Sequence, residues 1–237
     1  MRNIINQCGQ WLRNEVEKAH ASGIVLGLSG GIDSSVLAAI GREALGKDRV
    51  LGIIMPCHSI EEDEKDARLL IEALDINFMR VDLSGVFDLM LKAVSGELNS
   101  LTKSNMKARL RMVTLYAVAQ SKNFLVCGTS NKSEYETGYF TKFGDSGVDL
   151  MPLANFLKRE IREIAKILNV PEKIINKAPS AGLYEGQTDE GDMGFSYDVL
   201  DEYLTTGKID DEKARERIDV MRRRSEHKRK PIPIFKF

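Results

Sequence analysis

Residues 24–34 place an apolar run directly before a glycine turn and a predicted helix start. The run 24–28 has the length and composition of a buried strand, and Ser29–Gly31 follows it without a charged residue. Glycine lets successive backbone N–H groups converge on one point, and a helix that begins near Ser34 directs the positive end of its dipole there. The segment therefore predicts an anion site in an α/β fold, at the edge where the first strand ends.

This turn lacks the lysine of the Walker pattern, which requires Gly-Lys-Ser/Thr after a four-residue spacer. The turn instead contains Asp33. A carboxylate repels a phosphate but binds a cation, so Asp33 suits a Mg²⁺ ion that is itself bound to a pyrophosphate. The alternative is a plain connection in which Asp33 caps the helix. Six consecutive positions, Ser29–Ser34, resemble the signature of the ATP pyrophosphatases, which cleave ATP between its α and β phosphates. We therefore favour phosphate binding.

Length and composition fit a single domain with almost no net charge. The chain has 237 residues, of which 43% are hydrophobic, so we expect a single domain over residues 1–237. Its 34 basic and 35 acidic residues give a net charge of -1, so overall charge predicts no nucleic acid and no membrane as a partner. The three cysteines are far apart, and no segment approaches the ~20 apolar residues of a membrane span. We expect a cytoplasmic protein.

Strand-like and helix-like segments alternate along the first half. Further apolar runs predict buried strands over Val50–Met55, Ile76–Val81 and Phe124–Cys127, and helical patterns lie over Ser34–Leu45, Glu61–Leu74 and Met106–Ser121. This alternation predicts a doubly wound parallel sheet with helices on both faces, a Rossmann-like α/β fold. Ligands of such sheets bind outside the carboxyl ends of the strands. The glycine turn, Pro56–Ser59 and Gly128–Asn131 are therefore expected to face one crevice.

Two glycine-rich segments, 138–152 and 178–194, interrupt the second half. Loops longer than about 12 to 15 residues are uncommon in compact domains and often serve as lids or binding loops. Their carboxylates and glycines suit lids that close over a charged ligand. Disorder without ligand is the alternative for the second loop.

Five blocks together are similar to ammonia-dependent NAD synthetase over nearly the whole chain. In order they are Ser29–Ser34, Asn105–Met112, Gly128–Glu134, Gly138–Asp145 and Lys177–Leu183. The resemblance implies the ATP pyrophosphatase type of fold and a homodimer with the dinucleotide near the interface. Two departures are Ser180, where threonine is common, and Gly182, where aspartate is frequent.

The same resemblance implies the site residues. The ATP site is implied for Gly27, Leu28, Ser29, Gly30, Gly31, Ile32, Asp33, Ser34, Thr129, Lys158 and Ser180, with Mg²⁺ on Asp33 and Glu134. The deamido-NAD site is implied for Arg109, Lys142, Asp149, His227 and Lys228. Among these, Asp33, Lys158 and Asp149 are the expected catalytic residues.

The residues' own patterns give weaker expectations. A helical wheel centred on Leu110 puts Met106, Val113, Ala117 and Ser121 on the core stripe, with Arg109 and Arg111 on opposite flanks, so that one arginine can reach a ligand. Lys158 opens a helix whose apolar stripe predicts that its ammonium projects to solvent. His227 and Lys228 lie in a basic run, which by itself is typical of a solvated helix face or a nucleic-acid patch.

The expected reaction is amidation of deamido-NAD with ammonia, through an adenylated carboxylate, to give NAD, AMP and pyrophosphate. The sequence contains no recognisable glutaminase unit, so nitrogen is expected from free ammonia or from a separate chain. Two other hypotheses are an RNA-acting ATP pyrophosphatase and a non-catalytic ATP sensor. The first is expected to carry a C-x-x-C pair or a basic RNA module, and the second has no need to keep Asp33 and Glu134 together.

Overall fold

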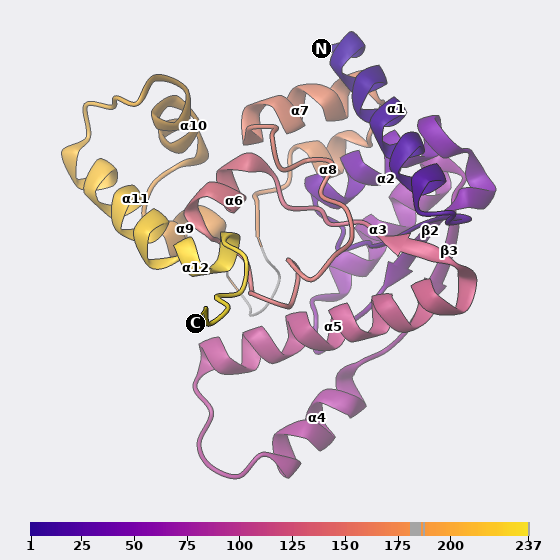
Figure 1. Ribbon diagram of the computed structural model, residues 1–237, viewed down its shortest axis with the longest axis horizontal. Helices are drawn as coiled ribbons and strands as arrows, with labels where there is room; N and C mark the ends of the chain where they lie inside the picture. Colours follow the sequence, from indigo (N-terminus) through magenta and orange to yellow (C-terminus); the bar gives the residue numbers. More distant parts are fainter. Residues whose placement is uncertain (181–185, 187, 237) are drawn as a thin grey trace.

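A four-stranded parallel sheet forms the centre of the computed structural model, which describes residues 1–180, 186 and 188–236 (Figure 1). The strands are β1 (Gly23–Gly27), β2 (Val50–Ile54), β3 (Asn77–Arg80) and β4 (Phe124–Val126), in the order β3-β2-β1-β4. In the register of the sheet, Val25 of β1 lies beside Leu51 of β2 on one side and Val126 of β4 on the other. The predicted parallel α/β fold is confirmed, and strand order reverses at β1, beside the glycine turn.

Helices cover both faces of the sheet. One face packs α1 (Arg2–Lys18), α2 (Ile32–Leu45), α3 (Glu61–Leu74), α7 (Lys158–Ile167) and α8 (Glu172–Ile175) over side chains such as Ile24 and Leu26. The other face packs α4 (Ser84–Ala93) and α5 (Ser100–Lys122) over Val25 and Ile53. Successive residues of β1 thus enter opposite cores, as the pleat of a strand requires. A short 3-10 turn, η1 (Lys47–Arg49), leads into β2.

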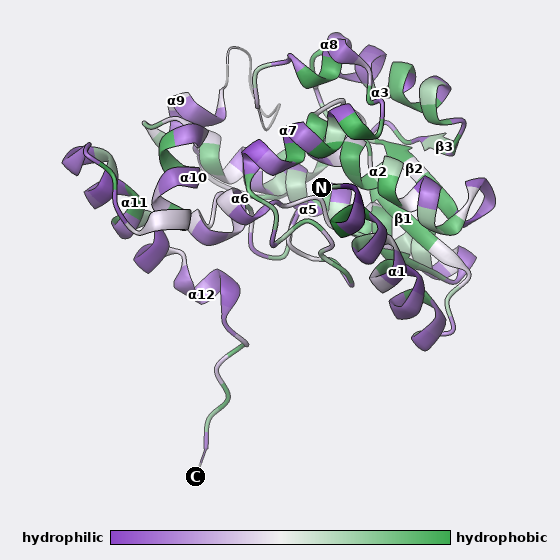
Figure 2. Cartoon of the chain, turned by 90° about the horizontal axis from the view of Figure 1, so that it is seen from above, coloured by the Kyte–Doolittle hydropathy of each residue, from purple (hydrophilic) through white to green (hydrophobic). Residues whose placement is uncertain are grey.

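A smaller group of helices lies beside the sheet rather than on it (Figure 1). It contains α6 (Lys132–Thr137), α9 (Asp189–Met193), α10 (Tyr197–Thr206), α11 (Glu212–Arg224) and α12 (Glu226–Arg229). Its own core includes Met193, Tyr197, Leu200 and Ile218. Figure 2 shows hydrophobic residues gathered on the strands and α2, whereas α11 and α12 are largely hydrophilic.

The expectation of a loop over 178–194 is wrong for Asp189–Met193, which form α9. Its first turn is capped because the Thr188 hydroxyl accepts a hydrogen bond from the Gly191 N–H at 3.2 Å. Gly182 lies outside the described residues, so its departure from the family pattern has no structural account. Among the described helices, none is both long and apolar enough to cross a bilayer.

The basic run near the C-terminus is only partly a solvated face: Arg223, Arg224, His227 and Lys230 are exposed, whereas Lys228 and Arg229 contact the chain around residues 135–140. Lys228 Nζ donates to the carbonyl oxygens of Gly138 and Phe140 at 2.7 and 2.6 Å, and the Ser225 hydroxyl donates to the Thr137 carbonyl at 3.1 Å. Gly138 has φ +69°, and a Cβ there would lie 2.0 Å from Ser225 Cβ. The run fastens α12 onto the segment that follows α6.

Candidate nucleotide-binding site

A cavity of about 1050 Å³ opens at the carboxyl ends of the strands. Its lining includes the glycine turn after β1, Pro56 and Ser59 after β2, and Gly128–Ser130 after β4. The expectation that three strand ends face one crevice is therefore confirmed. Side chains of α5, the 138–145 segment and Lys177–Ser180 complete the wall.

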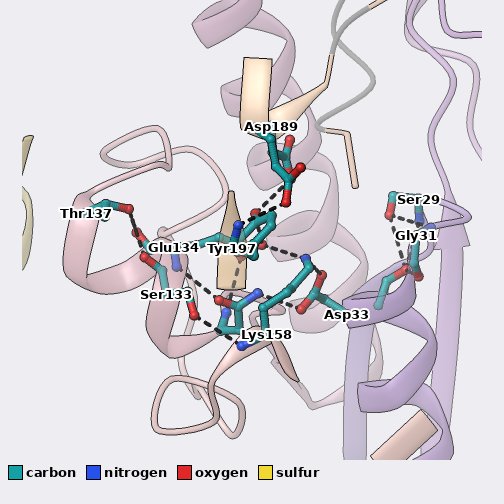
Figure 3. Close-up of polar contacts among 12 residues, drawn as sticks. Ser29, Gly31, Asp33, Ser133, Glu134, Thr137, Lys158, Asp189 and Tyr197 are labelled. Carbon is teal, nitrogen blue, oxygen red and sulfur yellow. Dashed lines mark hydrogen bonds and ion pairs between the residues drawn. The ribbon is translucent and has the colours of Figure 1, made fainter. Parts of the chain in front are cut away.

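The glycine turn is closed by its own hydroxyl groups. Ser34 Oγ donates to the Gly31 carbonyl at 3.0 Å, and Ser29 Oγ accepts the Gly31 N–H at 3.2 Å (Figure 3). Gly30 has φ +76°, and a Cβ there would lie 2.3 Å from the Asp63 carbonyl oxygen. Only glycine fits between the turn and α3 in this conformation. The turn stands at the N-terminus of α2, where an anion is stabilised.

Beside this turn, Lys158 binds both of the carboxylates predicted to hold a metal ion. Its Nζ lies 2.6 Å from Asp33 Oδ2 and 3.1 Å from Glu134 Oε1 (Figure 3). The Lys158 side chain is 2% exposed, so the expectation that its ammonium projects to solvent is wrong. The apolar stripe of α7 faces α2, but α10 packs on α7 as well, so both sides of the helix are covered.

Asn131 positions the two carboxylates relative to each other. Its side chain caps α6 by accepting the Glu134 N–H at 3.0 Å, and the Asn131 N–H donates to Glu134 Oε2 at 3.3 Å. The amide nitrogen of Asn131 also donates to Asp33 Oδ1 at 2.8 Å. One capping box thus joins the start of α2 to the start of α6.

The sequence missed two members of this site, Tyr197 and Asp189. The Tyr197 hydroxyl lies 2.8 Å from Asp189 Oδ2 and 3.2 Å from Glu134 Oε1, and Lys158 Nζ lies 4.7 Å from the centroid of the Tyr197 ring. Asp189 is buried, and its Oδ1 has no hydrogen-bond partner among the described residues. The acidic stretch around Asp189 in a predicted lid was the available signal, whereas Tyr197 carried none.

Burial controls the electrostatics of this group, here called the Lys158 cluster (Asp33, Glu134, Lys158, Asp189 and Tyr197). Burial raises the pKa of Glu134 to about 7, although Lys158 opposes the rise. Burial also raises the pKa of Asp189. For Lys158, burial alone favours the neutral amine, but the carboxylates of Asp33 and Glu134 outweigh it and raise the pKa. The lysine is therefore firmly cationic, while Glu134 binds a proton readily.

The residues implied for deamido-NAD fall into two places. Arg109 donates to the Lys142 carbonyl at 3.2 Å, Lys142 Nζ donates to the His227 carbonyl at 2.7 Å, and Lys228 lines the cavity. Arg109, Lys142, Asp149 and His227 lie outside the described lining of the cavity. The Asp149 carboxylate accepts hydrogen bonds from the Tyr116 hydroxyl at 3.0 Å and from the Val126 N–H at 2.8 Å. The structure thus links four of these residues and separates Asp149.

The helical wheel for α5 is partly wrong. Val113, predicted to face the core, is 58% exposed, while Ala119 is buried. Arg111 is the arginine that lines the cavity, where it donates to the Met55 carbonyl at 3.2 Å and to Ser59 Oγ at 3.1 Å. Two further residues implied for ATP, Thr129 and Ser180, also line the cavity.

The donor set fits a magnesium ion better than a transition metal. Among the described residues, no group of three or more His, Cys, Asp and Glu side chains could hold a metal ion by itself. Mg²⁺ is usually held by one or two carboxylates together with phosphate oxygens and water. Asp33 and Glu134 already share one cation, the Lys158 ammonium. Their placement beside a phosphate-binding turn therefore suits Mg²⁺ on a nucleotide.

A parallel sheet, a glycine turn at the N-terminus of α2 and a carboxylate pair beside that turn define an α/β nucleotide-binding protein of the ATP pyrophosphatase type. Within that class, residues 4–232 match the family model for NAD synthase. The chain belongs to the NAD synthase family, as the five sequence blocks predicted.

Curated and solved relatives agree with this assignment. The chain is 49% identical over 228 residues to the NH(3)-dependent NAD(+) synthetase of Finegoldia magna, covering 96% of this chain and 93% of that protein. NMN synthetase from Francisella tularensis superposes with TM-score 0.96 at 40% identity, covering 100% and 98%. NH3-dependent NAD synthetase from Campylobacter jejuni superposes with TM-score 0.83 at 30% identity, covering 99% and 98%.

Proposed function

We propose that this chain is an ammonia-dependent NAD synthetase, which amidates deamido-NAD with ammonia at the expense of ATP. The observation that carries the proposal is the Asp33–Glu134 pair beside the glycine turn, in a cavity that also presents Lys158 and Lys228. The family match supplies the class of reaction. We further propose that residues 1–237 act as one catalytic domain in the cytoplasm.

The chemistry asks mainly for positioning and electrostatic stabilisation. A carboxylate does not react with ammonia directly because oxide is its leaving group. Attack of the nicotinate carboxylate on the α-phosphate of ATP forms an acyl adenylate and releases pyrophosphate, and attack of ammonia on the adenylate then releases AMP. The N–H groups of the glycine turn and the ammonium of Lys158 stabilise the negative charge that develops. No protein nucleophile is needed.

Asp33 and Glu134 are proposed to hold Mg²⁺, which when bound would neutralise charge on the triphosphate. Thr129, Lys158 and Ser180 are proposed ATP contacts, as are Gly27–Ser34. Arg109, Lys142, Asp149, His227 and Lys228 are proposed deamido-NAD contacts. Asp149 is also retained as a proposed catalytic residue, although it lies apart from the cavity in one subunit.

A homodimer is proposed, formed through the face of α4 and α5 that points away from the sheet. Val86, Leu89, Leu101 and Val113 on these helices are 50%, 68%, 68% and 58% exposed. Asp149 contacts Tyr116 of α5, so a dimer through this face brings a second chain toward Asp149. That arrangement supports a dinucleotide site completed at the subunit interface.

The dimer is tested by Leu89→Glu, which is expected to give monomers in sedimentation equilibrium because it places a charge in an apolar interface. Leu69→Glu is the matched control, since Leu69 is an exposed leucine on α3, 37% exposed, away from this face. A Leu89→Glu protein that stays dimeric would rule out this interface.

The reaction is tested by mixing the purified chain with ATP, Mg²⁺, deamido-NAD and ammonium. Equal amounts of NAD, AMP and pyrophosphate are expected, and glutamine is expected to fail as the nitrogen donor. Release of ADP would exclude the adenylate. AMP formation with an RNA substrate in place of deamido-NAD would favour the RNA-acting alternative, and ATP binding without turnover would favour the sensor.

A second candidate acid is nicotinate mononucleotide, and a specific observation favours including it. Of the two solved relatives compared above, NMN synthetase superposes with the higher TM-score, 0.96 against 0.83, and at higher identity. Both acids present the same nicotinate carboxylate to ATP, so the Lys158 cluster serves either. The ratio of kcat/KM for the two acids, measured side by side, decides which is the substrate.

A further inference from the structure

Each carboxylate oxygen of the two proposed metal ligands, Asp33 and Glu134, has a hydrogen-bond partner in this structure. Asp33 Oδ2 accepts from Lys158 at 2.6 Å, and Asp33 Oδ1 accepts from Asn131 Nδ2 at 2.8 Å. Glu134 Oε1 accepts from Lys158 at 3.1 Å and lies 3.2 Å from the Tyr197 hydroxyl, while Oε2 accepts the Asn131 N–H at 3.3 Å. The pair is satisfied by the protein's own donors, of which Lys158 is the charged one.

A divalent cation and this ammonium compete for the same oxygens. Two positive charges a few ångströms apart repel each other strongly at a buried site, where water does not screen them. Lys158 is 2% exposed, so screening is weak here. A metal ion on the Asp33 and Glu134 oxygens is therefore opposed by Lys158 as long as the ammonium stays between them.

We propose that Lys158 is the resident counter-cation of the Asp33–Glu134 pair, and that a divalent metal displaces its ammonium from the pair. Displacement leaves the ammonium available to a triphosphate in the same cavity, so metal arrival and phosphate binding by Lys158 are coupled. The proposal rests on the proposed function only in taking Asp33 and Glu134 as the metal ligands.

The backbone of Lys158 is held by contacts that do not involve its ammonium. The backbone N–H of Lys158 donates to Ser133 Oγ at 3.1 Å, and Ser133 Oγ donates to the buried carboxylate of Asp201 at 2.6 Å. These two hydrogen bonds anchor the start of α7. The lysine side chain is a flexible stem of four carbons. The ammonium can therefore change partners without a shift of the Lys158 Cα.

A second lysine in the chain provides a matched control. Lys173 also contacts a buried carboxylate, with its Nζ 2.7 Å from Asp66 Oδ1, but Lys177 Nζ lies 2.6 Å from Asp66 Oδ2. Removal of Lys173 still leaves Asp66 with a cation. Removal of Lys158 leaves Asp33 and Glu134 with no ion-pair partner among the described residues.

The test measures Mn²⁺ binding by electron paramagnetic resonance, without nucleotide and at the same pH for all variants. Lys158→Met is expected to bind Mn²⁺ about tenfold more tightly than the wild type, because one repelling charge is gone. Lys173→Met is expected to match the wild type. Equal or weaker binding by Lys158→Met overturns the proposal.

Thermal unfolding gives a second readout with Mg²⁺ alone. Lys158→Met is expected to lose stability without metal, because two buried carboxylates are uncompensated, and to recover it with Mg²⁺ but not with NaCl of equal ionic strength. If Lys158→Met does not fold, Lys158→Gln purified in Mg²⁺ and then stripped replaces it. A loss that Mg²⁺ does not reverse overturns the proposal.

The wild-type chain gives a readout that needs no variant. Burial and ion pairing are expected to slow proton exchange of the Lys158 ammonium enough for detection by ¹⁵N nuclear magnetic resonance, and saturating Mg²⁺ is expected to shift or abolish that signal. An unchanged signal with metal bound overturns the proposal. None of these readouts uses NAD formation, so failure of the proposed reaction and failure of this exchange are separate results.

Discussion

Two lysine–carboxylate clusters adjoin the glycine turn, one through Asp33 and the other through Asp63, and they differ in how charge is balanced. In the Lys158 cluster, one buried lysine serves Asp33 and Glu134, with Asp189 nearby. In the second, here called the α3 cluster (Glu62, Asp63, Asp66, Lys173 and Lys177), one buried carboxylate, Asp66, contacts two lysines.

The difference distinguishes a candidate cation site from a structural contact. The α3 cluster has two lysines for three carboxylates, and both lysines contact its buried carboxylate, Asp66, so the cluster holds α3 against α8 and the segment that begins at Lys177. The Lys158 cluster has only one lysine for three carboxylates, and such an excess of negative charge in a cavity favours a cation from solution. Similar residue types therefore serve different purposes because their charge balance differs.

The largest expected effect comes from Asp33→Asn, which removes one charge from the Lys158 cluster and keeps the shape. Turnover is expected to fall about 10²- to 10³-fold, since charge stabilisation at the phosphates is lost, while circular dichroism stays native. Asp66→Asn is the matched change in the α3 cluster and is expected to cost stability, about 3 kcal/mol, rather than chemistry. Near-normal turnover of Asp33→Asn would remove Asp33 from the mechanism.

Gly30→Ala tests the turn that adjoins both clusters. The new Cβ would lie 2.3 Å from the Asp63 carbonyl, so the turn or α3 must shift. We expect a loss of about a hundredfold in kcat/KM, since misplacement by about 1 Å has that cost. Gly46→Ala is the control, because Gly46 also has positive φ, +86°, but a Cβ there meets nothing within 4 Å. Equal activity losses in the two variants would mean that backbone strain, not the contact with α3, matters.

The pH dependence of stability is expected to come from Glu134. Its pKa in the folded protein is about 7, above the ordinary 4.5, so the folded state holds a proton that the unfolded chain releases. The stabilisation is complete below the ordinary pKa and is lost as pH rises through about 7. The metal-free melting temperature is expected to fall between about pH 5 and about pH 8, and Glu134→Gln to flatten that slope. An unchanged slope in Glu134→Gln would assign the effect elsewhere.

The smallest expected effect is that of Lys173→Met in the α3 cluster. Lys173 is 52% exposed, and Lys177 stays on Asp66, so a stability change of about 1 kcal/mol or less is expected in urea unfolding. A larger loss would mean that the α3 cluster is as sparsely neutralised as the Lys158 cluster, and the contrast between them would fail.

The sequence predicted the sheet and the glycine turn because both are local patterns. The strand ends also brought Asp33 and Glu134 together, as the parallel topology requires. Burial of Lys158 was not predictable from α7 alone, since helical periodicity reports which face is apolar and not what packs on the other face. Here α10 packs there, and Tyr197 at the start of α10 reaches the cluster.

The error on α5 has a related cause. An apolar stripe shows which face of a helix is hydrophobic, but it does not show that another element of the chain covers that face. Val113 belongs to such a stripe and is 58% exposed. Arg111, by contrast, lies in the cavity because Met55 and Ser59 at the end of β2 lie against α5, a contact that no local pattern encodes.

Lys228 joins α12 to the wall of the cavity. Its ammonium donates to the Gly138 and Phe140 carbonyls, so α12 holds the segment that follows α6 in place. The shape of the cavity therefore depends on a helix that lies far from the glycine turn in the sequence, and a substitution that releases α12 is expected to loosen that wall without touching the turn.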